Sequence, residues 1–179
     1  MKLVRAVCAV CALLVFGFPL SVFGQAAAAQ PEAILHPSDL TNVLPEKVFF
    51  RGQSATTQLR NSGGVRFSDG AMMLAALVDN SGYSSGVQQK YQAYLMTEAT
   101  LDFGGHQLAP GAYGVGIVKT GGDLNFVVMN LAAQDLFQTA AGNDEKLHRP
   151  TPLQVMAGSG AGMYRLYLGR DYVEFGRAK

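Results

Sequence analysis

The sequence contains no tryptophan, only two cysteines and few charged residues. Two cysteines cannot build a disulfide-dense scaffold or a four-thiolate zinc site. A formal net charge of +1, with 15% of residues charged, gives no basis for nucleic-acid binding, which depends on clustered lysine and arginine. The hydrophobic fraction of 49% excludes a disordered chain, and 179 residues suffice for one domain with a hydrophobic core.

The first 24 residues have the three parts of a secretory signal peptide. Lys2 and Arg5 give a positive start, an uncharged apolar run follows, and Gly24 supplies a small residue at the cleavage point. The alternative is an uncleaved membrane anchor, but the run is near the lower length for spanning a bilayer and is interrupted by a glycine and a proline. We therefore expect a signal peptide at 1–24 and a periplasmic or extracellular location in a bacterium.

Cleavage changes the composition of the exported chain. Cys8 and Cys11 both lie inside the apolar run, so the 155 residues that remain contain no cysteine for lipid attachment or any other purpose. The loss of Lys2 and Arg5 leaves 12 basic against 13 acidic residues, a net charge of −1. Thiol proteases, thiol–disulfide exchange and cysteine zinc sites are excluded, and we expect no cofactor and no metal.

Two regions follow the signal peptide. Residues 25–45 form a leader rich in alanine and proline, in which one helical turn is expected at 38–40. From 46 to 179 the apolar residues recur mainly with a period of two, and glycine-rich turns separate short segments, which is typical of a single β-rich domain. We expect the leader to be a tether or an arm that lies across this domain.

The clearest strand is predicted over residues 94–103, where apolar and polar side chains alternate. This alternation fits a sheet that has one face on a hydrophobic core. The face predicted to point inward carries Leu95, Thr97, Ala99, Leu101 and Phe103.

The remaining segments complete a mainly β prediction. The apolar run 71–78 fits either a helix or a buried strand, and its short length between turn residues favours the strand. A turn is expected at 61–64 and a polar loop at 80–86. One short helix is predicted over 131–140, with an asparagine cap before it and a Gly-Asn stop after it. The pattern predicts an antiparallel β-sandwich or barrel.

One stretch resembles a known family. Residues 100–115, TLDFGGHQLAPGAYGV, form a strand–turn–strand corner, and a strand ending in VVMN follows at 127–130. Over residues 98–130 the chain resembles a bacterial family of exported β-sandwich domains of unknown function, although it lacks the Trp-Arg pair that this family carries upstream of the corner. The resemblance implies an exported β-sandwich and implies no activity, because the family has none assigned.

No catalytic motif is assembled in the sequence. The glycine-rich segment 158–162 is followed by a strand pattern, so we interpret it as a turn and not as a phosphate loop or a nucleophile elbow. His36, His106 and His148 are too far apart in sequence to resemble paired metal ligands. The acidic pairs are expected on wet surfaces; they are Glu98 with Asp102 and Asp144 with Glu145.

Seven tyrosines follow the predicted signal peptide, and several lie close to arginines. Tyrosine and arginine are enriched in contact surfaces, although tyrosines also line cores with their hydroxyls in water. On the strand around Arg165, this residue and Tyr167 are expected on the face opposite Tyr164 and Leu166. The candidate binding residues are Tyr91, Tyr94, Arg165, Tyr167, Arg170 and Tyr172.

These observations predict a non-enzymatic binding or envelope-structural module. Its partner is expected to be a protein or another envelope component, with no nucleic acid and no membrane span after signal cleavage. Two alternatives stay open. One is a secreted hydrolase that gathers His106 or His148 with an acid and a serine. The other is a carrier of a small apolar ligand, suggested by the Met- and Leu-rich run at 72–77.

Overall fold

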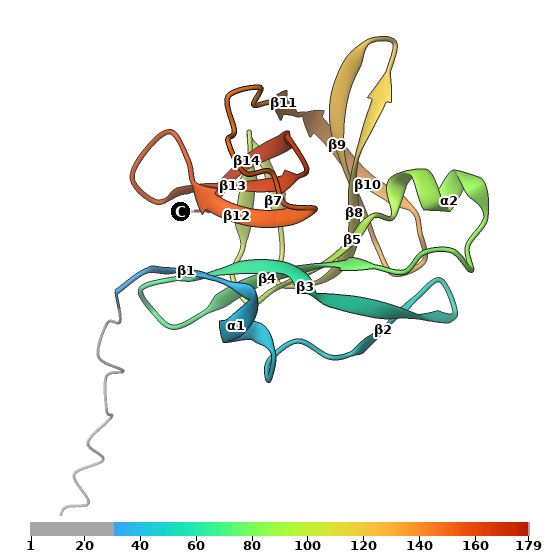
Figure 1. Cartoon of the computed structure of the whole chain (residues 1–179), viewed down its shortest axis with the longest axis horizontal. Coiled ribbons are helices and arrows are strands. Elements are labelled where there is room, and N and C mark those ends of the chain that lie inside the picture. Colours follow the sequence, from blue (N-terminus) through green and yellow to red (C-terminus); the bar gives the residue numbers. More distant parts are fainter. Residues whose placement is uncertain (1–30, 179) are drawn as a thin grey trace, which may run out of the picture.

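Two antiparallel sheets pack face to face in the computed structural model, which describes residues 31–178 (Figure 1). The large sheet has eight strands and the small sheet has six, which confirms the predicted antiparallel β-sandwich. The predicted signal peptide lies outside the described residues, as does the start of the leader.

Each sheet is assembled from strands that are separated in sequence. The large sheet has the order β1–β3–β4–β5–β8–β9–β10, with β2 paired to β3; the small sheet has the order β12–β13–β14–β6–β7, with β11 paired to β14. The large sheet contains β1 (Ala33–Leu35), β2 (Lys47–Phe50), β3 (Gln53–Arg66), β4 (Met72–Val78), β5 (Ala93–Thr97), β8 (Gly111–Thr120), β9 (Asp123–Met129) and β10 (Asp135–Ala140). The small sheet contains β6 (Leu101–Phe103), β7 (His106–Leu108), β11 (Gly142–Asn143), β12 (Leu153–Ala157), β13 (Met163–Leu168) and β14 (Asp171–Arg177).

The segment predicted as one long strand crosses from one sheet to the other. β5 pairs with β4 and β8 in the large sheet, whereas β6 pairs with β7 and β14 in the small sheet. At the crossing, the Thr97 hydroxyl donates a hydrogen bond to the carbonyl of Ala99 at 2.6 Å, which satisfies a buried polar group. The predicted inward face is confirmed across the bend, since its members are all buried: Leu95, Thr97, Ala99, Leu101 and Phe103.

The core between the sheets is centred on aromatic rings. Phe103 stacks on Phe126 and on Phe175, with ring centroids 5.2 and 5.5 Å apart. These three side chains come from both sheets and are fully buried. The packing therefore joins the two sheets at their centre.

The far face of the large sheet is also covered. Figure 1 shows α1 (Pro37–Leu40) below that sheet, on the side away from β12. Leu40 packs with Leu74 and Ala76 of β4, whereas the alternate residues Met73 and Ala75 face the core between the sheets. Burial on both faces explains the continuous apolar run and confirms the strand predicted at 71–78.

A second aromatic cluster packs against β8 on the far face of the large sheet, close to α2 (Ser85–Lys90). Phe50 stacks on Tyr91 at 3.9 Å, and the ring of Tyr83 meets both of them edge-on. The prediction of a polar loop at 80–86 missed the start of α2, because its six residues form a helix too short to show a sequence period.

The helix predicted over 131–140 is wrong, and β10 occupies most of that segment. Asn130 does accept hydrogen bonds from the backbone nitrogens of Ala132 and Gln134, both at 3.0 Å, as a helix cap would. Ala133 then adopts a φ of 63°, which ends any helical turn, and the chain folds back to pair with β9. The predicted helix stop at Gly142–Asn143 instead forms β11.

The turn predicted at 61–64 is also wrong. Residues 53–66 form one strand, β3, whose register against β4 shifts between Gln58 and Ser62. The intervening residues 59–61 therefore form a bulge, and the glycines beyond them stay in the strand. A Cβ on Gly64 would meet the carbonyl oxygen of Met73 at 2.5 Å, so this glycine permits close strand packing.

Gly114 tests the packing of the second cluster. A Cβ at this position would lie 2.5 Å from the Phe50 ring and 2.9 Å from the Tyr91 ring, both of which are fully buried. We expect Gly114→Ala to lower the free energy of unfolding by about 1–3 kcal/mol, through overpacking. Urea denaturation measures the change, and Gly86→Ala in α2 is the matched control, since a Cβ there would meet nothing within 4 Å. An equal effect of both substitutions would contradict the packing.

The described part of the leader is held by Tyr164. Its hydroxyl donates a hydrogen bond to Glu32 Oε2 at 2.7 Å, and burial together with this carboxylate raises the pKa of Tyr164 to about 12. The ordinary value in an unfolded chain is about 10. The stabilisation is therefore complete below about pH 10 and is lost as the pH rises from about 10 to 12.

We expect Tyr164→Phe to cost about 1 kcal/mol at neutral pH, because one hydrogen bond is lost. Its stability should then fall less than that of the wild type between about pH 10 and 12. Chemical denaturation at several pH values measures both effects, and parallel alkaline losses in the two proteins would contradict the assignment to Tyr164.

Candidate functional site

The outer face of the small sheet presents a polar and aromatic patch. Cross-strand pairing places Gln154, Tyr167 and Tyr172 in one row and Met156, Arg165 and Glu174 in the next. Their chain neighbours Val155, Leu166 and Val173 point into the core between the sheets, as the alternation of a strand requires. We call these six residues the outer-face patch: Gln154, Met156, Arg165, Tyr167, Tyr172 and Glu174.

Arg165 is the centre of the patch. Its guanidinium lies 4.4 Å from the centroid of the Tyr172 ring, and its Nε donates a hydrogen bond to Glu174 Oε2 at 3.1 Å. The Ser159 hydroxyl donates to the other oxygen of Glu174 at 2.5 Å. The bond from Ser159 and the charge of Arg165 hold the pKa of Glu174 below its usual range, so both partners of the ion pair stay charged at neutral pH.

The ion pair remains accessible. The side chains of Arg165 and Glu174 are 27% and 28% exposed. Such a partly exposed pair stabilises the fold little, but it presents a planar cation stacked on an aromatic ring in a fixed orientation.

A loop from 144 to 149 lies beside the patch. The Tyr167 hydroxyl donates to Asp144 Oδ2 at 3.3 Å, and Tyr167 itself is only 2% exposed. Arg170 Nη1 donates to three carbonyl oxygens of the loop, those of Asp144, Glu145 and Leu147, at 3.3, 2.9 and 2.8 Å. Arg170 therefore shapes the loop, and Tyr167 supports the patch from below.

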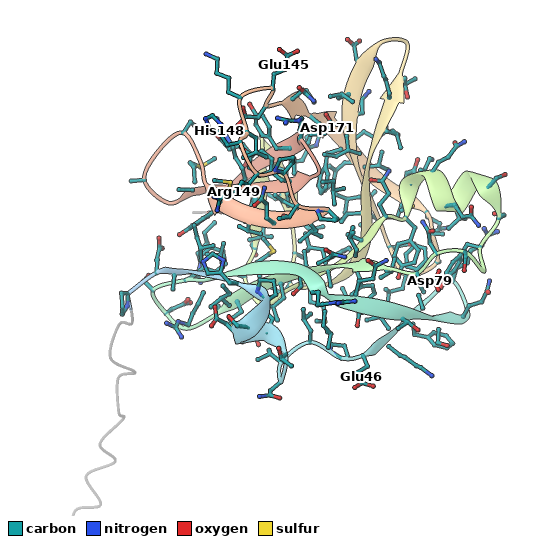
Figure 2. The ribbon with its side chains drawn as sticks, viewed as in Figure 1. Glu46, Asp79, Glu145, His148, Arg149 and Asp171 are labelled. Atoms are coloured by element: carbon teal, nitrogen blue, oxygen red, sulfur yellow. The ribbon has the colours of Figure 1, made fainter. Side chains whose placement is uncertain are left out.

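A groove of about 410 Å³ lies between this loop and β12. Leu147 and Met156 give it apolar surface, and among its charged residues Lys146 and Arg149 outnumber Asp144. Figure 2 shows His148 and Arg149 on the side of the loop toward β12, with Glu145 at its outer tip. The groove is continuous with the patch through Met156, which is 39% exposed.

The structure divides the six predicted binding residues into two groups. Arg165, Tyr167 and Tyr172 come together on the small sheet, and Arg170 lies in the turn between β13 and β14, where it binds the neighbouring loop. Tyr91 and Tyr94 do not join them, because both lie in the buried cluster on the far face of the large sheet, whereas Tyr167, although also buried, belongs to the small sheet. These two tyrosines are therefore core residues, and the prediction that they belong to a binding surface is not supported by their burial.

Tyr91 provides a test of this assignment. Burial raises the pKa of its hydroxyl, which has no hydrogen-bond partner among residues 31–178. Removing an unsatisfied buried polar group is neutral or favourable, so we expect Tyr91→Phe to leave the free energy of unfolding unchanged or to raise it by about 1 kcal/mol. Thermal and urea denaturation measure the effect, with Tyr83→Phe as control.

Tyr83 has the partner that Tyr91 lacks. Its hydroxyl donates to the carbonyl of Phe50 at 3.0 Å, so Tyr83→Phe should be destabilising. Destabilisation by Tyr91→Phe equal to that of Tyr83→Phe would contradict the account of Tyr91.

The three histidines occupy separate exposed positions. His36 precedes α1, His106 stacks on Phe137 with centroids 5.0 Å apart, and His148 lies in the loop beside the groove. Within the described residues, no group of three or more His, Cys, Asp or Glu side chains is placed to hold a metal ion. The glycine-rich segment 158–162 is the turn between β12 and β13, as predicted.

The acidic pairs are used locally. Glu98 Oε2 accepts from the backbone nitrogen of Met72 at 2.9 Å, and Asp102 Oδ1 accepts from that of Gly105 at 2.7 Å. The run 72–77 that suggested an apolar carrier is explained by burial on both faces of β4. What remains beside it is a surface hollow of about 230 Å³ formed partly by Val43, Met72 and Met96.

Sequence reasoning missed Met156, Ser159, Glu174 and the loop. β13 and β14 form a tight hairpin in which Glu174 lies opposite Arg165, so a register argument from the sequence could have found this partner. The position of the loop could not be predicted in this way, because it depends on hydrogen bonds from Arg170 to residues 23 to 26 positions away in the sequence.

Comparison with family models, curated proteins and solved structures gives no match for this chain. The resemblance over residues 98–130 therefore stays a prediction. In the part of the chain that the structure describes, no helix is long and apolar enough to cross a membrane.

Proposed function

We propose that this protein is an exported, non-enzymatic binding module of the cell envelope that binds a protein partner through the outer-face patch. The observation that carries the proposal is the stack of Arg165 on Tyr172, held by Glu174 and a quarter exposed. Arginine and tyrosine dominate the residues that contribute most to protein interfaces.

The surroundings of the stack support this choice of partner. Met156 adds a flexible apolar side chain next to Arg165, and methionine is enriched in interfaces. The groove beside it adds Lys146 and Arg149, which favour a partner segment with acidic residues. The predicted signal peptide supplies the expected location, where such a module meets envelope proteins.

The proposal is tested by site-specific photo-cross-linking. A photoreactive amino acid replaces Met156, and the purified protein is irradiated with envelope extract from the cells that produce it. We expect a discrete cross-linked product whose yield falls about tenfold or more when Arg165→Ala is added, because loss of a central interface arginine removes much of the binding energy.

Two controls make the result specific. The photoreactive residue at Leu136, which is exposed at 47% on β10, should give no such product. Arg51→Ala, at an exposed arginine between β2 and β3, should leave the yield at position 156 unchanged. A product that forms equally from position 136, or that survives Arg165→Ala undiminished, would overturn the proposed surface.

A further inference from the structure

A separate pocket lies where the edge strand β12 of the small sheet meets β3 and the start of α1. Its volume is about 150 Å³, close to the space of about five water molecules. Arg60, His36 and Gln154 supply its polar lining, and Leu35, Pro37 and Leu153 supply apolar lining. Three segments of the chain form its walls, from residues 35–37, 60–63 and 151–155.

The β3 bulge builds this pocket. Residues 59–61 have no pairing partner on β4, because they lie between the pairs Gln58–Leu77 and Ser62–Ala76. Arg60 is therefore not paired with β4 at the point where β3 borders the pocket. Gly63 lets β12 approach, because a Cβ there would lie 3.0 Å from the backbone nitrogen of Val155. Bulges that redirect a side chain in this way are common beside binding sites.

Two side chains of the pocket, Gln154 and Arg60, carry donors with no protein acceptor in the part of the chain that the structure describes. Gln154 Nε2 is buried and has no hydrogen-bond partner among residues 31–178. Arg60 is exposed, forms no ion pair within the same residues, and has a guanidinium that can only donate. The hydroxyl of Ser62 already donates to the carbonyl of Leu59 at 2.6 Å.

No carboxylate is among the described residues that line this pocket. Glu46 borders a second hollow together with Arg60 but forms no ion pair with it, and Asp39 Oδ2 accepts from the backbone nitrogen of His36 at 2.8 Å. A buried amide without a partner costs free energy that a bound acceptor would recover. An anionic oxygen in the pocket would accept from the Gln154 amide and pair with the Arg60 guanidinium at the same time.

We propose that this pocket binds a small monocarboxylate with a short aliphatic chain. The carboxylate accepts hydrogen bonds from Arg60 and Gln154, and the chain lies against Leu35, Pro37 and Leu153. An inorganic oxyanion such as phosphate fits less well, because several of its oxygens would face these apolar side chains without partners. The site is independent of the protein-binding role proposed above, although Gln154 borders both hollows.

Titration calorimetry with sodium butyrate at constant ionic strength tests the proposal. We expect saturable binding at one site, with a dissociation constant in the millimolar range for so small a ligand. Arg60→Gln should weaken binding about tenfold or more, since a charge-assisted hydrogen bond is lost. Arg51→Gln is the matched control and should bind as the wild type does.

Gln154→Leu distinguishes a loss of butyrate binding from a loss of fold stability. It removes the unpartnered amide but keeps the size of the side chain, so binding should weaken at least about fivefold while the melting temperature stays equal or rises. Butyramide, the neutral analogue, should not bind. The proposal is overturned by butyrate affinity that is unchanged in Arg60→Gln, by phosphate binding as tight as butyrate binding, or by the absence of saturable binding.

Discussion

The packing of Phe103, Phe126 and Phe175 is the interaction on which the rest of the molecule depends. Residues 31–178 contain no cysteine, so no disulfide joins the two sheets there. Burial of one such ring contributes about 1.5–3 kcal/mol relative to leaving it exposed. Phe175 is the chain neighbour of Glu174, so the strand that fills the core with one face displays the outer-face patch with the other.

The covering of the large sheet explains why the proposed binding surface is on the small one. Among the described residues, α1 and α2 pack on the far face of the large sheet. Together with side chains of β2 from that sheet, they form two apolar clusters. The outer face of the small sheet has instead a polar patch and a loop fixed by Arg170. The small sheet, packed on the large one, holds Arg165 and Tyr172 in contact before a partner arrives, and such a preformed arrangement lowers the entropic cost of binding.

Periodicity predicted the fold well because alternation records burial directly. It assigned the inward face from Leu95 to Phe103 correctly even though the chain changes sheets within that stretch. It failed at 131–140, where good helix formers follow an asparagine cap, because pairing with β9 and the left-handed Ala133 outweigh local preference.

The candidate site was only partly accessible to the same reasoning. Arg165 and Tyr172 were grouped because they are close in sequence, and the tight β13–β14 hairpin brings their side chains into contact. Tyr91 and Tyr94 were grouped with them because composition cannot distinguish a tyrosine that contacts a partner from one that is buried. The bulge of β3 and the loop at 144–149 depend on long-range contacts that a single sequence does not reveal.

The central claim is that the outer-face patch is covered by a partner in the cell. Because both native cysteines precede residue 25, Met156→Cys and Phe49→Cys each introduce a single thiol into the predicted exported chain, at positions 39% and 62% exposed. Labelling with a small thiol reagent is compared in intact producing cells and in purified protein. The account predicts that the Met156→Cys thiol is protected in cells and labelled freely when purified, while the Phe49→Cys thiol is labelled in both. Equal labelling of the two positions in cells would contradict it.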